Sequence, residues 1–274
     1  IKDLSMRCLH SEREDQQISI MFQKLFVEPH LVEEIRQSLM GSFDVDGLFQ
    51  VVLIAIENSD QFDAIERRRI SFQLQLCLEK IDSPYTFFWF DSHFVLIVNN
   101  LEETILEKVI DKMYKRSKKR MLTNSLYVGI GSQMSDLSQL ILSYKRALAA
   151  VNMAMKFDYP IINFEEMGVY QILFSIEDKQ ILISMYYRLL QPLINYDQKH
   201  HSELEKTLYY YLVYDGSMQA MAKNLYMHRN TINYRMNKIK ELLNCEFESI
   251  DEKMEYLLAF YIKKIMNAKK NRSS

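Results

Sequence analysis

The sequence has few of the features that cross-link a chain or carry it into a membrane. Only three cysteines occur in 274 residues, and Cys8, Cys77 and Cys245 are far apart and have no metal-ligand spacing. This odd, scattered set argues against a disulfide framework and a zinc site, so we expect reduced thiols in a cytoplasmic protein. No stretch of 18 uninterrupted apolar residues and no signal peptide occur, and we expect no membrane contact.

An overall excess of positive charge is also lacking. The 34 lysines and arginines are outnumbered by 36 acidic residues, which gives a formal net charge of −2. A chain that coats nucleic acid along its whole length is therefore excluded, and any such contact must come from a local patch. The length suits about two domains, whose cores the 48% of hydrophobic residues can fill. Because the chain begins with Ile1 rather than methionine, we expect a fragment that follows an upstream domain.

The most informative stretch, residues 217–244, reads as two short amphipathic helices joined by a tight turn. Apolar residues recur at helical spacing in each half, so each helix has one buried stripe. Every formal charge between residues 217 and 240 is positive, which indicates a surface that faces phosphates. The stripes are Met218, Met221, Ala222 and Leu225, then Ile232, Met236, Ile239 and Leu243; the cations are Lys223, Arg229, Arg235, Lys238 and Lys240.

Residues 43–168 alternate between strand and helix patterns. The apolar run 48–56 is rich in β-branched residues and is bounded by Gly47 and Asn58, which is typical of a buried strand. The order β-α-β-β-α-β-α predicts an α+β fold in which helices pack against a largely antiparallel sheet. The predicted strands are 48–56, 85–90, 94–98 and 126–130, and the predicted helices are 65–78, 101–114 and 137–155.

Breaks at prolines, glycines and polar residues divide the chain further. Residues 1–42 are predicted as a helical connector, whose helices either pack on the next domain or dimerise and transmit a signal. A helical linker is predicted over 169–199, and a helix-turn-helix domain over 200–266 with a polar tail at 267–274. Within that domain Ser217 is a candidate N-cap, and Ser249 and Glu252 have capping-box spacing.

The order of elements in 43–168 resembles the GGDEF fold of diguanylate cyclases. The segments Val128-Gly129-Ile130-Gly131 and Ser143 to Leu148 resemble that family's last strand and helix. The family's metal-binding aspartate is matched by Ala55, and the hairpin around Asp91 and Ser92 lacks the signature glycines and glutamate. Without them a triphosphate and a divalent cation lose their contacts, so we predict a degenerate, non-catalytic domain with no cofactor and no metal.

A helical projection of residues 229–243 separates a buried face from a polar one. With Ile232 at the centre of the buried face, the opposite face carries Asn230, Tyr234 and Asn237, with Asn233 and Lys238 beside it. Asparagine can pair with adenine in the major groove, whereas Arg229 and Lys238 can neutralise phosphates. His228 either caps the helix or binds a phosphate. Arg235 lies nearer the buried side, where a structural ion pair with Glu241 or a neighbouring helix is as reasonable as DNA contact.

The segments Asp215-Gly216-Ser217, His228-Arg229-Asn230-Thr231 and Tyr234-Arg235 closely resemble the C-terminal helix-turn-helix of PucR/CdaR-family bacterial transcription regulators. In that family the motif commonly follows a degenerate GGDEF-like domain, which is the order found here over residues 43–266. Asn244 stands where the family often has glycine, and asparagine tolerates the left-handed conformation of such a position. The resemblance implies a metabolite-responsive regulator with an upstream sensor, and it includes Thr231 in the DNA-binding segment.

We therefore predict a DNA-binding transcriptional regulator that contacts double-stranded DNA as a homodimer or higher homo-oligomer, with an unidentified small-molecule effector. Two units on neighbouring half-sites would supply the surface that one small domain lacks. One alternative is a nucleotide cyclase of unusual sequence, which the missing acids at Ala55 and Ser92 disfavour. The other is a nucleotide-sensing or protein-interaction module, which would require an apolar exposed face opposite Ile232.

Overall fold

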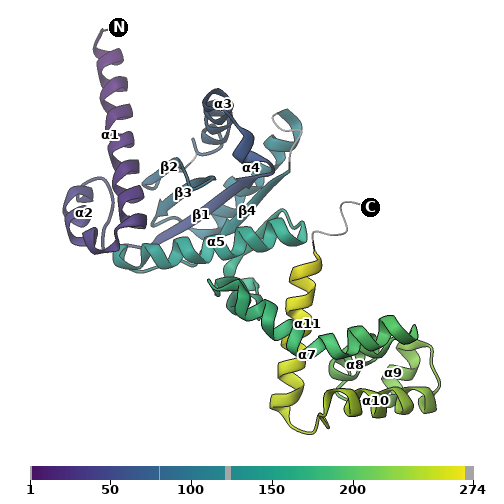
Figure 1. Cartoon of the computed structure of the whole chain (residues 1–274). Coiled ribbons are helices and arrows are strands. Elements are labelled where there is room, and N and C mark those ends of the chain that lie inside the picture. Colours follow the sequence, from purple (N-terminus) through teal and green to yellow (C-terminus); the bar gives the residue numbers. More distant parts are fainter. Residues whose placement is uncertain (1, 80, 121–124, 269–274) are drawn as a thin grey trace. The chain divides into compact units, whose positions relative to one another are not determined.

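A computed structural model describes residues 2–79, 81–120 and 125–268. The chain divides into two compact units, residues 1–175 and residues 176–274, and each is considered by itself (Figure 1). No helix within the described ranges is long and apolar enough to cross a membrane. Cys77 and Cys245 are free and buried, whereas the side chain of Cys8 and most of the predicted tail at 267–274 lie outside the description.

The first unit is built on a mixed sheet with the strand order β2-β3-β1-β4-β5. β1 is central and buried along its whole length, as its apolar sequence predicts. Its neighbours β3 and β4 are both antiparallel to it, whereas β5 pairs in parallel with β4 from Val128↔Ile161 onwards. The predicted α+β class with a largely antiparallel sheet is confirmed. The strands are β1 (Phe49–Ile56), β2 (Tyr85–Phe90), β3 (His93–Asn99), β4 (Leu126–Ile130) and β5 (Ile161–Asn163).

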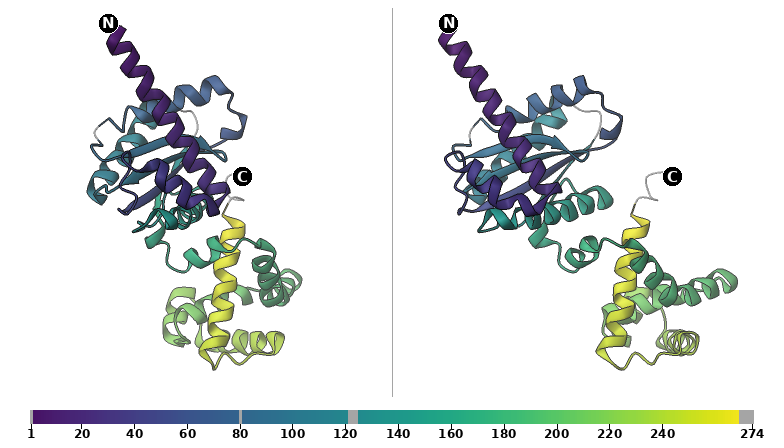
Figure 2. Two further views of the ribbon diagram at one scale, coloured as in Figure 1. Left: turned by 90° about the vertical axis from the view of Figure 1, so that its left-hand side faces the viewer. Right: turned by 60° about the vertical axis from the view of Figure 1, so that its left-hand side comes forward.

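Helices cover both faces of the sheet, so the unit has two hydrophobic cores (Figure 1 and Figure 2). α3 and α4 pack on the face that carries Val52, Ile54 and Ile56. α1, α2 and α5 pack on the face that carries Val51, Leu53 and Ala55. The helices of this unit are α1 (Lys2–Val27), α2 (Val32–Leu39), α3 (Ala64–Gln75), α4 (Glu103–Arg120), α5 (Leu140–Phe157) and α6 (Tyr170–Ser175), with short 3-10 turns at Pro29–Leu31, Ser59–Gln61, Leu137–Gln139 and Phe164–Glu166.

The helices before residue 42 are part of this packing. Phe22 and Leu25 of α1, with Ile35 and Leu39 of α2, are buried in the core that also contains β1 and α5. Of the two alternatives for the predicted connector, packing on the next domain therefore describes residues 18–39. The sequence could not reveal this, because the partners of these side chains lie on strands far along the chain.

The hairpin between β2 and β3 is tighter than the three-residue turn predicted for it. Phe90 pairs directly with His93, so only Asp91 and Ser92 form the turn. Their φ values of 45° and 65° are both positive, as a type I′ turn requires. The turn thus holds two non-glycine residues in the left-handed region.

The second unit is all-helical. Leu189, Leu190 and Leu193 of α7 are buried with Leu208, Met221 and Ile232 in one core. α7 covers much of the region predicted as a linker, yet it supplies a wall of this core. The reason is that its apolar stripe has α8, α10 and α11 to pack against. The helices are α7 (Lys179–His200), α8 (Leu204–Val213), α9 (Met218–Leu225), α10 (Arg229–Leu243) and α11 (Ile250–Asn267).

Candidate nucleic-acid interface

The turn between α9 and α10 is fixed by caps on both sides. The hydroxyl of Ser217 accepts the N–H of Ala220 at 3.4 Å and begins α9. α9 ends at Tyr226, which has φ 53° and ψ 40° and whose N–H bonds to the carbonyl of Ala222. A residue in the left-handed conformation ends the helix and turns the chain sharply, so α10 starts only three residues later.

His228 is the N-cap of α10. Its Nδ1 accepts the N–H of Asn230 at 3.3 Å. Of the two roles considered for this imidazole, the structure therefore shows helix capping. Capping satisfies one of the N–H groups that the first turn of a helix leaves without a partner, and it sets where α10 begins.

α10 has the two faces that its sequence predicts. Ile232, Met236 and Ile239 are buried against the other helices of the unit. The remaining surface is polar, and it carries every predicted DNA-contacting side chain of this helix. Lys238 is half-buried and the others are exposed: Arg229, Asn230, Thr231, Asn233, Tyr234 and Asn237. Tyr234 is 70% exposed. Its aromatic ring therefore lies on the same polar surface of α10 as the exposed asparagine side chains.

The cations of this region differ in how free they are to meet a phosphate. Lys238 donates to Glu241 at 2.9 Å, and Lys240 donates to Glu246 at 2.8 Å. These carboxylates raise the pKa of both lysines. Lys223 and Arg229 are exposed and form no ion pair within the described part of the chain. Fewer cations are therefore available to bind phosphates than the five positive charges in the sequence predict.

Arg235 has a structural role. Its Nη1 lies 3.3 Å from Oε2 of Glu203 and 3.3 Å from the hydroxyl of Thr207. The predicted ion pair with a neighbouring helix is thus confirmed, with a partner at the start of α8 rather than Glu241. Hydrogen bonds from Lys206 and then Arg235 lower the pKa of Glu203. This contact joins α10 to α8 and holds α10 in place.

The far end of the unit is also closed as its sequence predicts. Asn244 ends α10 with φ 48° and ψ 48°, the left-handed conformation expected where the family often has glycine. Ser249 and Glu252 form a complete capping box at the start of α11. His228 and Asn244 therefore set where α10 begins and ends, and the capping box sets where α11 begins.

The two positions predicted to match acidic residues of a cyclase site carry no carboxylate. Ala55 is buried in β1 with an apolar side chain, and Ser92 occupies the hairpin turn. Nδ1 of His93 lies 2.6 Å from the carbonyl oxygen of Asp91, and burial lowers the pKa of this imidazole. In the residues that the structure describes, no group of three or more His, Cys, Asp and Glu side chains could hold a metal ion.

Comparison with known proteins agrees with this geometry. Residues 32–153 match the model of the GGDEF-like domain, and residues 204–262 match that of the PucR C-terminal helix-turn-helix domain. The first match includes α2, which the predicted boundary at residue 43 left out.

Two curated proteins of Bacillus subtilis are similar to the chain. The proline-responsive transcriptional activator PutR is 24% identical over 266 residues, which cover 93% of this chain and 64% of that protein. The DNA-binding transcriptional activator AdeR is 26% identical over 147 residues, 53% of this chain and 35% of that protein. The chain therefore spans less than two thirds of either relative.

Among solved structures, a regulator of polyketide synthase expression from Bifidobacterium adolescentis aligns with 93% of this chain and 98% of its own. The sequence identity is 13% and the TM-score is 0.41.

Proposed function

The chain belongs to the PucR-type transcriptional regulators, with a GGDEF-like domain ahead of a PucR C-terminal helix-turn-helix domain, and from this premise we propose that it binds operator DNA through α10. The observation that carries the proposal is the exposed face of α10. Asn230, Asn233 and Asn237 are exposed on it, and a side-chain amide can form two hydrogen bonds with adenine in the major groove.

The positioning of that helix would come from phosphate contacts at its start. Arg229 and Lys223 lie on either side of the turn between α9 and α10, and both are free of ion pairs in the described residues. Cations at such places fix the orientation of a recognition helix on the duplex without reading sequence. Thr231 and Lys238 then flank the amides, and His228 serves by capping the helix.

We propose that two or more copies bind together. One helix-turn-helix unit buries too little surface for tight operator binding, whereas two units on half-sites about 34 Å apart supply enough. The polar character of the exposed face disfavours the alternative in which α10 docks on another protein, because an interaction helix presents apolar anchors.

The experiment is a binding titration with DNA from upstream of the protein's own gene and with random DNA of equal length, at two salt concentrations. We expect preferential binding of the upstream DNA and a stoichiometry of two chains per site. Loss of the preference on replacing Asn230 and Asn233 by alanine supports the assignment of α10. Absence of specific binding at both salt concentrations overturns the proposal.

We further propose that the GGDEF-like domain is not a catalyst and that the regulator responds to a metabolite, as its relative PutR is a proline-responsive activator. Ala55 and Ser92 support the first part, since neither side chain supplies a carboxylate for a divalent cation. Incubation with GTP and magnesium tests it, and we expect no cyclic dinucleotide. Product that disappears in a hairpin variant would contradict it.

A further inference from the structure

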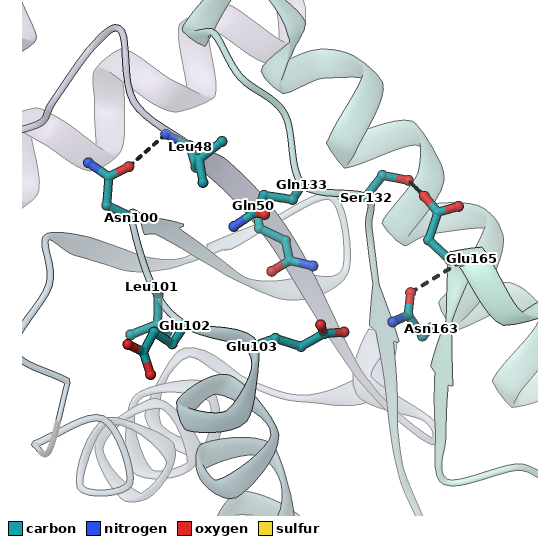
Figure 3. A pocket seen from close by; sticks show the side chains of 10 residues that line it. All are labelled: Leu48, Gln50, Asn100, Leu101, Glu102, Glu103, Ser132, Gln133, Asn163 and Glu165. Atoms are coloured by element: carbon teal, nitrogen blue, oxygen red, sulfur yellow. Dashed lines mark hydrogen bonds between the residues drawn. The ribbon is translucent and has the colours of Figure 1, made fainter.

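A cleft of about 590 Å3 opens at the end of the sheet where β1 begins and β3, β4 and β5 end (Figure 3). Gln50 of β1, Asn163 of β5 and Glu103 at the start of α4 lie around it. The hairpin that matches the cyclase signature lies at the other end of β1, since Phe94, next to His93, pairs with Ile54, whereas Asn99 pairs with Phe49 at the start of β1. The cleft is thus a separate feature of the domain, and its volume is typical of a small-molecule site.

The charge of the cleft has one sign. Glu102, Glu103 and Glu165 line it, and no lysine or arginine is among the lining residues. Glu102 and Glu103 form no ion pair within the described residues. Glu165 accepts a hydrogen bond from Ser132, and Arg146 approaches it only to 3.9 Å. An anion, including a nucleotide phosphate, is therefore repelled here, whereas a cation is attracted.

Gln50 offers a hydrogen-bond acceptor to this cleft. The residue is only 9% exposed, and its Nε2 donates to the carbonyl of Gly131 at 2.8 Å. Its Oε1 accepts no hydrogen bond from any described residue, and Figure 3 shows the carboxamide among the side chains that line the cleft. This oxygen is accessible to solvent, so it can accept an N–H or O–H of a molecule bound in the cleft.

A smaller hollow of about 150 Å3 continues from the cleft, and it shares Gln50, Glu103 and Asn163. Its wall is aliphatic, and its rim carries two more carboxylates. The aliphatic side chains are Leu106, Ile110, Ile130 and Ile161, and the carboxylates are Glu107 and Glu166. Hydrocarbon between separated negative charges suits a flexible chain with an amine at each end better than a compact ion.

We propose that this site binds an aliphatic diamine or polyamine. Its methylenes lie on the wall between Leu106 and Ile161, an ammonium group at one end meets Glu103 and Gln50, and one at the other end meets the rim carboxylates Glu107 and Glu166. A divalent metal ion is a poorer occupant, since no three acidic or imidazole side chains in the described residues come together around one point. Asn163 lines both hollows. Its Oδ1 accepts the N–H of Glu165, and its neutral Nδ2 adds no positive charge that would oppose a cation.

The test is isothermal titration of the full chain with spermidine in 150 mM salt, beside magnesium chloride as the control for a compact multivalent cation. No DNA is present, so the result stands apart from the proposal that α10 binds DNA. We expect saturable binding of spermidine at one site and no saturable binding of magnesium. Absence of saturable spermidine binding, or an equal response to magnesium, overturns the site.

Two variants then locate the binding. Glu103→Gln removes one charge at the cleft, and Gln50→Leu removes the amide acceptor at similar volume; each should weaken binding by about fivefold or more. Glu79→Gln removes an exposed charge that lines neither hollow and should leave the affinity unchanged. Circular dichroism confirms that each variant is folded. If Glu103→Gln, which alters only an exposed side chain, leaves the affinity as it was, the assignment of the cleft fails.

Discussion

The Nζ of Lys238 lies 2.9 Å from Oε1 and 3.0 Å from Oε2 of Glu241, one turn further along α10. The same ammonium group stands 5.6 Å from the centre of the Tyr196 ring. A phosphate that recruits this lysine must first compete with a carboxylate of the same helix. Arg229, at the start of α10, has no such competitor among the described residues, so the two cations are not equivalent.

Replacing Arg229 by alanine is therefore expected to affect DNA binding more than replacing Lys238. The Arg229→Ala change should weaken binding to all sequences alike and reduce the slope of log K against log salt by about 1, because one phosphate contact is lost. The Lys238→Ala change should move that slope by less. Fluorescence anisotropy with specific and random DNA between 50 and 200 mM salt measures both slopes.

Two further variants frame that comparison. Arg229→Lys keeps the charge and should keep the slope, and Lys240→Ala removes a lysine already paired with Glu246 and should leave it near the wild-type value. A larger change of slope for Lys238→Ala than for Arg229→Ala would contradict the distinction drawn from the ion pairs.

The amides of α10 are expected to act on sequence preference instead. Asn233→Ala should cost about 1–3 kcal/mol of binding free energy on the operator and very little on random DNA, because a base contact is lost but no phosphate contact. Titrations of both DNAs with the variant give this difference. Asn195→Ala, an exposed amide on α7, is the matched control and should leave both affinities unchanged. An equal loss on both DNAs for Asn233→Ala would exclude a role in base reading.

Features that depend on neighbouring residues were predictable from the sequence. The run 48–56 gave the buried strand β1, and Ser249 with Glu252 gave the capping box of α11, because both signals lie within a few residues. The polar face of α10 followed from helical spacing alone. In these parts of the fold and of the candidate interface, the structure differs least from what the sequence predicts.

Features that depend on distant residues were not predictable. β5 has only three residues and exists as a strand because β4 lies beside it. The partner of Arg235 is Glu203, which lies 32 residues away, and no local pattern selects it over Glu241. Lys238 and Lys240 each form an ion pair with a glutamate, whereas Arg229 forms none among the described residues. A count of charges in the sequence cannot make this distinction.

The contact between Arg36 and Asp136 gives a prediction about pH. Nη2 of Arg36 donates to both carboxylate oxygens, at 2.9 and 2.8 Å, and so ties α2 to the loop before α5. Hydrogen bonds from Ser138 and then from Arg36 lower the pKa of Asp136 from 3.8 to about 2. A lowered pKa in the folded state means that the ionised form stabilises the fold above about pH 4. That contribution is lost as the pH falls from about 4 towards 2.

Asp136→Asn should therefore lower the free energy of unfolding of the first unit by about 1 kcal/mol at pH 6, a value reduced for partial exposure of the carboxylate. The difference from wild type should shrink as the pH falls from 4 to 2. Urea unfolding followed by the fluorescence of Trp89 measures it, because this single tryptophan lies in β2 of that unit. A difference that stays constant across this range would rule out the linkage.

Gly129 gives the prediction with the largest effect on stability. It lies in β4 under α5, and a Cβ at this position would stand 2.2 Å from the backbone nitrogen of Val151 and 2.4 Å from the carbonyl oxygen of Ala147. Both atoms belong to the backbone of the helix, so no side chain can rotate away. Gly129→Ala must push α5 off the sheet, at a cost of about 3 kcal/mol.

Gly41→Ala is the control, since a Cβ there meets nothing within 4 Å although φ is +96°. It adds only the strain of a positive φ, about 1 kcal/mol. Urea unfolding followed by Trp89 fluorescence should therefore rank wild type above Gly41→Ala and Gly41→Ala above Gly129→Ala. If the two variants are equally stable, the close approach of α5 to β4 does not explain the glycine at 129.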